Sequence, residues 1–158
     1  MNRRPSILAC FLAGLLILPL ALPAQTVGQA APEFTAPDAA NNFLSLTSLR
    51  GQVVIVYFWA AWCSPCKRYM PELRRLDQTW RARGVTILPI GMSGTHGKDQ
   101  DWLRDNGFTF PCAVFTGGWF TGAWTAVDSI PFIAIVDRGG IVRWLGKTNV
   151  PESILGDI

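Results

Sequence analysis

Two cysteines, Cys63 and Cys66, are separated by two residues at the point where a strongly apolar run of the chain ends. Such a pair can bind a metal ion, close a structural bridge or exchange electrons with other thiols. A structural zinc site commonly takes four Cys or His ligands, whereas beyond its apolar N-terminus this chain adds only Cys112 and His96. A bridge that closes so small a loop removes little entropy from the unfolded chain. The spacing therefore favours redox-active sulfur.

The segments around the cysteine pair predict a strand followed by a helix. Residues 53–60 (VVIVYFWA) are β-rich and apolar on both faces, which is typical of a central strand that helices bury from both sides. Residues 66–84 carry apolar side chains at helical spacing and end at Gly84, with Pro71 expected to kink the helix. The pair therefore lies at a strand-to-helix junction.

A helix start explains why one of the two cysteines would be reactive. Unpaired N–H groups and the positive end of the helix dipole stabilise an anion there, and such settings lower a cysteine pKa from ~8.5 to as little as ~3.5. Because the thiolate is the nucleophile in disulfide exchange, Cys63 is the expected attacking residue. Cys66, one turn later, is expected to lie deeper and to resolve the mixed disulfide that Cys63 forms.

The rest of the chain predicts one α/β domain around a single mixed sheet. The length of 158 residues fits one domain. Residues 25–42 are interpreted as a linker that leads into an N-terminal extension. The expected elements are a short strand and then a turn at 43–51, strands at 85–92, 110–115, 129–137 and 140–146, helices at 98–107, 117–127 and 149–158, and a hairpin turn at 137–140.

The N-terminus predicts export. Arg3 and Arg4 precede an uncharged apolar stretch at residues 7–24, which indicates a secretory signal cleaved after Ala24 or, alternatively, an uncleaved membrane anchor. The working domain is then residues 25–158, in the periplasm or otherwise outside the cytoplasm. Removing residues 1–24 takes away two positive charges, so the net charge falls from +3 to about +1. No basic block remains, and nucleic acid is not an expected partner.

The segment FWAAWCSPCKRYMP resembles a thioredoxin-fold active site, with Trp62 before the Cys-x-Pro-Cys and Pro71 five residues after it. A second signature is SIPF, in which Pro131 resembles the cis-proline that packs against the active-site disulfide in this fold. The resemblance implies that the backbone of Ile130 pairs with a substrate strand. Trp62, Ile130 and Pro131 are therefore the predicted substrate-binding residues.

Two further features narrow the resemblance to one group. Cys66 and Pro131 lie far enough apart for one additional βα unit, and the segment GQAAPEF…LTSLRG resembles the start of the redoxins. Together these features resemble the TlpA/ResA/DsbE-like group of extracytoplasmic thiol-disulfide oxidoreductases. The resemblance implies a thioredoxin-like three-layer α/β sandwich with a central mixed β-sheet, an N-terminal extension and a central βα insert.

The same resemblance implies a function. The Cys63–Cys66 dithiol/disulfide would exchange with protein thiols and disulfides, without a cofactor or a metal. The direction implied is reduction, as in cytochrome c maturation or general disulfide reduction, with a membrane thiol-electron transporter (DsbD/CcdA-like) as partner. Protein disulfide oxidation remains an alternative direction.

The sequence departs from the family pattern at the expected proton acceptors. Members of the group often carry an acid three positions after the second cysteine, where this chain has Tyr69, and thioredoxins carry a buried Asp where this chain has Tyr57. Glu72 is the nearest acid, and its position favours a solvent-facing helix residue. We therefore expect a changed rate or pH profile rather than lost chemistry.

Three other features have alternative interpretations. Cys112 is interpreted as a buried core thiol, with a third redox cysteine as the alternative. His96 is interpreted as a surface loop residue rather than a copper ligand. The aromatic residues Trp119, Phe120 and Trp124 are assigned to the core, with a docking surface for a partner as the alternative.

Two rival functions follow from the same residues. A peroxidase needs a Thr three residues before its reactive Cys, where this chain has Ala60. A copper-handling chaperone would use the cysteine pair and a distant His, although such proteins usually have three residues between the cysteines. Soft thiolates do suit Cu(I), so copper binding remains the non-enzymatic alternative.

Overall fold

The computed structural model describes residues 25–38, 40–94, 97–115, 124 and 126–158. The expected signal or anchor at residues 1–24 lies outside the described residues, as does most of the helix expected at 117–127. Within the described part of the chain, none of the helices is both long enough and apolar enough to cross a membrane.

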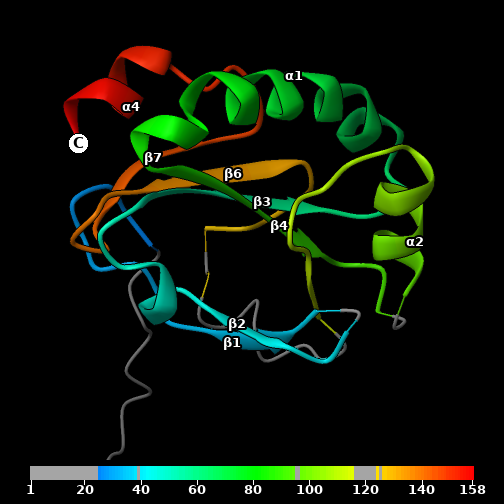
Figure 1. Ribbon diagram of the computed structural model, residues 1–158. Helices are drawn as coiled ribbons and strands as arrows, with labels where there is room; N and C mark the ends of the chain where they lie inside the picture. The colour runs from blue at the N-terminus through cyan, green and yellow to red at the C-terminus, as the bar shows by residue number, and fades with distance from the viewer. Residues whose placement is uncertain (1–24, 39, 95–96, 116–123, 125) are drawn as a thin grey trace, which may run out of the picture.

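A five-stranded mixed sheet forms the centre of the fold (Figure 1), as expected. Its middle strand, β3, has a parallel neighbour on one side and an antiparallel neighbour on the other. The strand order is β5 (Ala113–Val114), β4 (Val85–Gly91), β3 (Val53–Trp59), β6 (Phe132–Val136) and β7 (Val142–Gly146).

All seven residues of β3 are buried, which confirms the prediction of a central strand buried on both faces. Tyr57 and Trp59 point into a core shared with α1 (Ser64–Trp80), α2 (Lys98–Asp105) and α4 (Glu152–Asp157). Val56 and Phe58 point into a second core on the opposite face. Alternating side chains of one strand therefore anchor both layers.

On the second face a hairpin of strands lies against the sheet, whereas most of the helix expected at 117–127 lies outside the described residues. Among the described residues, that face is covered by the hairpin of β1 (Thr35–Pro37) and β2 (Phe43–Ser45) and by the segment before it. Figure 1 shows this hairpin across the sheet from α1 and α4. Phe34 and Ala36 are buried in the second core, so the hairpin supplies apolar surface to this face.

The interpretation of residues 25–42 as a linker was also wrong for most of its length. Besides β1, the segment 28–31 pairs with the outer edge of β7: the Gly28 N–H donates to the Val142 carbonyl at 2.8 Å, and Ala30 forms a bridge with Ile141. Pairing of this kind uses backbone groups alone. It therefore needs no apolar period in the sequence.

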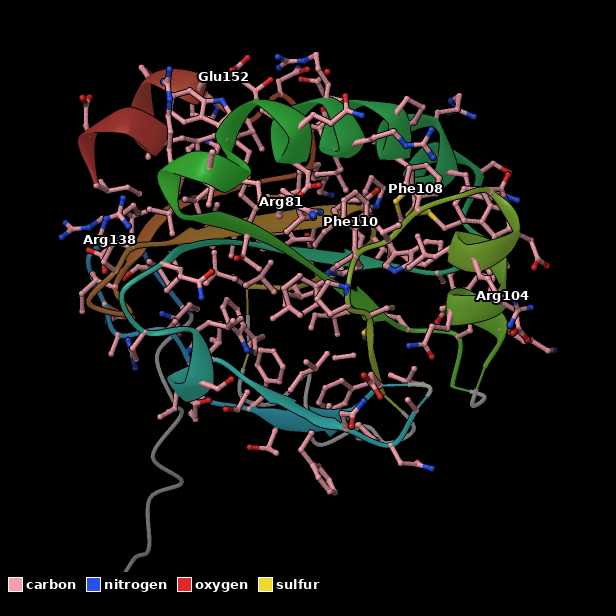
Figure 2. The ribbon with its side chains drawn as sticks, in the orientation of Figure 1. Arg81, Arg104, Phe108, Phe110, Arg138 and Glu152 are labelled. Carbon is pink, nitrogen blue, oxygen red and sulfur yellow. A yellow bond between two sulfur atoms is a disulfide. The ribbon has the colours of Figure 1, made fainter. Side chains whose placement is uncertain are left out.

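The described helices α1, α2 and α4 lie close to three of the four predicted helices. A short 3-10 turn, Arg81–Arg83, follows α1, and Gly84 ends it with a φ of 80°, a left-handed conformation that suits glycine. The C-terminal helix α4 is fastened to α1 by Glu152, whose carboxylate accepts from the Trp80 Nε1 at 2.8 Å and from Arg75 at 2.5 Å. Figure 2 shows Glu152 between the two helices.

The predicted hairpin at residues 137–140 is held by Asp137. The Ile141 N–H donates to its Oδ1 at 2.8 Å, and Arg143 Nε donates to its Oδ2 at 2.6 Å. Burial opposes ionisation of this carboxyl, but these two donors outweigh burial and hold the pKa of Asp137 below its usual value of 3.8. The ionised carboxylate therefore stabilises the folded chain.

Replacing Asp137 by Asn should lower the free energy of unfolding by about 1–2 kcal/mol at pH 7, because the hairpin loses a charged acceptor. A carboxyl with a lowered folded pKa contributes its stability above the unfolded pKa and loses it as the pH falls through the folded pKa. The difference between the two proteins should therefore shrink below about pH 4. Urea unfolding at pH 7 and pH 3 measures this difference in the free energy of unfolding, and substitution of the exposed Asp105 by Asn is the control. An equal difference at both pH values would contradict this assignment.

Candidate active site

The two cysteines form a disulfide at the junction of β3 and α1, where the sequence predicted them. Cys63 is the N-cap of α1, and its Sγ accepts a hydrogen bond from the Cys66 N–H at 3.2 Å. Figure 2 shows the sulfur–sulfur bond beneath the first turn of α1. Cys66 is fully buried, whereas Cys63 retains 4% of its exposure. The difference is small, but it agrees with Cys63 as the accessible sulfur.

The start of α1 favours negative charge on the Cys63 sulfur. Free N–H groups of the first turn and the helix dipole both stabilise an anion at an N-cap. Pro65 in that turn lacks an N–H, which costs little at a position where the donor has no partner within the helix. The arrangement therefore suits a thiolate nucleophile and a thiolate leaving group.

A groove of about 470 Å³ runs beside the disulfide turn. The Ile130–Pro131 peptide bond is cis, as predicted, and Ile130 forms part of the groove wall. The Trp62 side chain, 66% exposed, forms another part. The structure thus brings two of the predicted substrate-binding residues to one surface. Its remaining lining residues, which the sequence did not point to, are Met92, Val127, Asp128 and Ser129.

Two tyrosines occupy the positions where the family pattern suggests proton acceptors. The Tyr57 hydroxyl donates to the Cys66 carbonyl at 3.0 Å, and the Tyr69 hydroxyl accepts from the Val150 N–H at 3.3 Å. Burial raises the pKa of both hydroxyls above the ordinary value of 10. They therefore stay protonated at neutral pH and hold backbone in place. Glu72 lies on the outer side of α1 in an ion pair with Arg75, as expected for a solvent-facing residue.

A buried acid near the site was not singled out from the sequence. Asp99, in the first turn of α2, is fully buried, and its Oδ1 accepts from the Ala61 N–H at 2.6 Å. Ala61 lies in the turn that leads to Cys63. In sequence Asp99 looks like an ordinary acidic residue at a helix start, and its partner lies 38 positions earlier.

The other candidate residues fall into two groups. Cys112 is a free, buried thiol, which confirms its core position, and Trp124 is fully buried as well. His96, Trp119 and Phe120 lie outside the described residues. Among the residues that the structure describes, no three His, Cys, Asp or Glu side chains are grouped so that they could hold a metal ion.

Burial of Cys112 predicts a clear difference in thiol reactivity. Burial raises the pKa of this thiol to about 12, and the charge of Asp99 acts in the same direction. In the reduced protein at pH 7.5, iodoacetamide should therefore modify Cys63 at least ~100-fold faster than Cys112. Mass spectrometry of digested samples measures both rates, with guanidinium-unfolded protein as control. Comparable rates in the folded protein would support Cys112 as a third redox cysteine.

Comparison with known proteins places the chain in a family. Residues 27–145 match the AhpC/TSA family. The chain is 28% identical over 131 residues to the thiol-disulfide oxidoreductase ResA of Bacillus anthracis, covering 83% of this chain and 70% of that protein. It is 30% identical over 120 residues to ResA of Geobacillus thermodenitrificans, covering 76% of this chain and 68% of that protein.

Solved structures agree on the fold. The thioredoxin domain of a thiol-disulfide oxidoreductase from Bacteroides vulgatus superposes with a TM-score of 0.74 at 20% identity, covering 85% of this chain and 96% of that one. A thioredoxin-family thiol:disulfide interchange protein from Chlorobium tepidum gives 0.71 at 22% identity, covering 85% and 98%. The expected thioredoxin-like fold is confirmed. The chain belongs to the AhpC/TSA family, as a thiol-disulfide oxidoreductase related to ResA.

Proposed function

We propose that the protein reduces disulfides of other proteins outside the cytoplasm, with Cys63 as nucleophile and Cys66 as resolving cysteine. The observation that carries this proposal is the Cys63–Cys66 disulfide at the N-terminus of α1, directly beside an open apolar groove. Nucleophile and docking surface thus share one face.

The reaction runs in two exchange steps. The Cys63 thiolate attacks one sulfur of a substrate disulfide; a Cys63–substrate bond forms, the substrate disulfide breaks, and the released thiolate takes up a proton. Cys66 then loses its proton and attacks the Cys63 sulfur. The Cys63–Cys66 disulfide forms and the second substrate thiolate leaves. The substrate gains two electrons and the enzyme loses two, so a dithiol donor must restore the reduced pair.

The groove suits an extended segment of the substrate. Trp62 offers a large exposed apolar surface on one side, and the Ile130 backbone precedes the cis peptide bond on the other. A substrate strand that pairs with the Ile130 backbone would place its disulfide over Cys63. Backbone pairing selects for an extended chain rather than for one sequence.

A buried charge supports reduction as the direction. The carboxylate of Asp99 lies behind the active-site turn, bonded to the Ala61 N–H. Negative charge near a cysteine disfavours its thiolate and so favours the disulfide form of the pair, as a reductant requires. This effect opposes that of the helix N-terminus, and the balance between them sets the potential.

The resemblance to the extracytoplasmic group also suggests the location, the electron donor and the substrate class of this protein. Residues 1–24 would export or anchor the domain, and a membrane thiol-electron transporter (DsbD/CcdA-like) would return electrons to Cys63 and Cys66. Apocytochrome c during its maturation is the class of substrate that the resemblance implies, beside general disulfide reduction.

The redox potential of the pair tests the direction. Equilibration with glutathione buffers should give a value near or below about −270 mV, that of thioredoxin. Alkylation of free thiols followed by mass spectrometry measures the reduced fraction, with Cys63→Ser as control. A value near −120 mV would make the protein an oxidant and contradict the proposal.

The exposed indole of Trp62 should contribute to substrate binding. Replacing Trp62 by Ala should raise the KM for reduction of a peptide disulfide ~10-fold, since a large aromatic contact is lost, while iodoacetamide modifies Cys63 at an unchanged rate. Phe43 is a matched control, because it is also an exposed aromatic residue but lies on the β1–β2 hairpin. If Phe43→Ala raised KM equally, the groove would not be the substrate site.

A further inference from the structure

Asp99 is a buried charge that the exchange steps above do not use. It lies in the first turn of α2, within the βα unit between the cysteines and Pro131, and its side chain has no exposed surface. An isolated buried carboxylate is costly and persists only where donors compensate it. Its partners therefore indicate what it holds in place.

Three donors converge on this carboxylate. The Ala61 N–H donates to Oδ1 at 2.6 Å, and the Ser93 N–H donates to Oδ2 at 2.9 Å. The Ser93 hydroxyl also donates to Oδ1. Ala61 belongs to the turn between β3 and Cys63, whereas Ser93 belongs to the loop after β4. One carboxylate thus fastens two loops that come from neighbouring strands.

The two loops carry the nucleophile and two parts of the groove wall. The first continues through Trp62 to Cys63, and the second begins with Met92. Trp62 and Met92 both line the groove. Their relative position is fixed from behind by Asp99 and, on the backbone, by the bond from the Met92 N–H to the Trp59 carbonyl at 2.8 Å.

The space around the carboxylate is tight. A Cβ atom added to Gly91, at the end of β4, would lie 2.5 Å from Asp99 Oδ2 and 2.8 Å from Asp99 Cβ. Both distances are below van der Waals contact, so a side chain at position 91 would displace Asp99. Glycine at this position therefore allows the carboxylate to sit between the two loops.

From this arrangement we infer that Asp99 is a positioning residue of the active site, which holds Cys63 and Trp62 in register with Met92 across the groove. The inference rests on the proposed function and assigns a part of that site to the βα unit. An ionised carboxylate is the group that fits, because it accepts from all three donors, whereas an Asn amide would turn an N–H₂ group toward at least one of them.

Substituting Asp99 distinguishes a positioning role from an effect on the Cys63 thiol. Loss of position should lower kcat/KM, whereas loss of the charge should not slow the reaction of the Cys63 thiol. Asp99→Asn should lower kcat/KM for a peptide disulfide at least ~10-fold, since small displacements of reacting groups are costly. It also removes a negative charge near Cys63, which favours the thiolate. Iodoacetamide should therefore modify Cys63 in the reduced variant as fast as in the wild type, or faster.

Two further variants test the positioning role while the charge of Asp99 is kept, and thermal unfolding tests whether each variant folds. Gly91→Ala retains the carboxylate but displaces it, and should also lower kcat/KM. Ser93→Ala removes only the hydroxyl donor and should show a smaller loss. Asp101→Asn is the matched control, because Asp101 lies on α2 in an exposed ion pair with Arg104, and should react as the wild type does. Cooperative thermal unfolding establishes that each variant is folded.

Hydrogen exchange supplies a readout that needs no enzymatic activity. Amides 60–63 should exchange at least ~10-fold faster in Asp99→Asn, while β3 keeps its protection. Unchanged exchange, or a parallel fall in alkylation and kcat/KM, would overturn the inference. If the wild type and Asp101→Asn both fail to reduce the peptide although exchange responds as expected, the proposed function fails and the positioning role stands.

Discussion

Burial of β3 on both faces is the constraint on which the rest of the structure depends. The strand has hydrogen-bonded neighbours on both sides and sends alternate side chains into two separate cores. It has almost no freedom to move, so the residue that follows its end has a fixed position. The disulfide is placed there, at the border between this fully buried strand and the first turn of the longest described helix. Rigid elements hold reacting groups more precisely than loops do.

The chemistry of the site depends on the groups around the disulfide turn. The start of α1 favours the Cys63 thiolate, and the Asp99 carboxylate accepts from the Ala61 N–H in the turn that leads to it. The tyrosines at the positions of the expected acids take no charge at neutral pH, because burial raises the pKa of both hydroxyls. Both hydroxyls instead form hydrogen bonds with the backbone. The Tyr57 hydroxyl donates to the Cys66 carbonyl, and the Tyr69 hydroxyl accepts from the Val150 N–H before α4.

Local patterns in the sequence were sufficient for much of this description. The apolar run of β3, the helix after Cys63 and the β6–β7 hairpin each carry their signal within a few residues. The cis bond before Pro131 was expected only from the resemblance to the thioredoxin fold. Asp99 carries no such signal, because its role comes from an N–H group 38 positions away. The same is true of the segment 28–31, which pairs with the distant backbone of Ile141 and Val142. Contacts of this kind form only in the completed fold, and they produce no repeating pattern of apolar residues in the sequence.

The pairing of segment 28–31 with β7 has a consequence for the chain in a crowded compartment. Unpaired edge strands of a sheet invite pairing with other chains and thereby aggregation. In this protein one edge strand, β5, has only two residues, and the beginning of the other, β7, is occupied by the chain's own N-terminal segment. A truncation that removed residues 25–31 would leave the cysteines untouched and yet open that edge. By occupying these backbone groups, the segment before β1 withholds them from pairing with another chain.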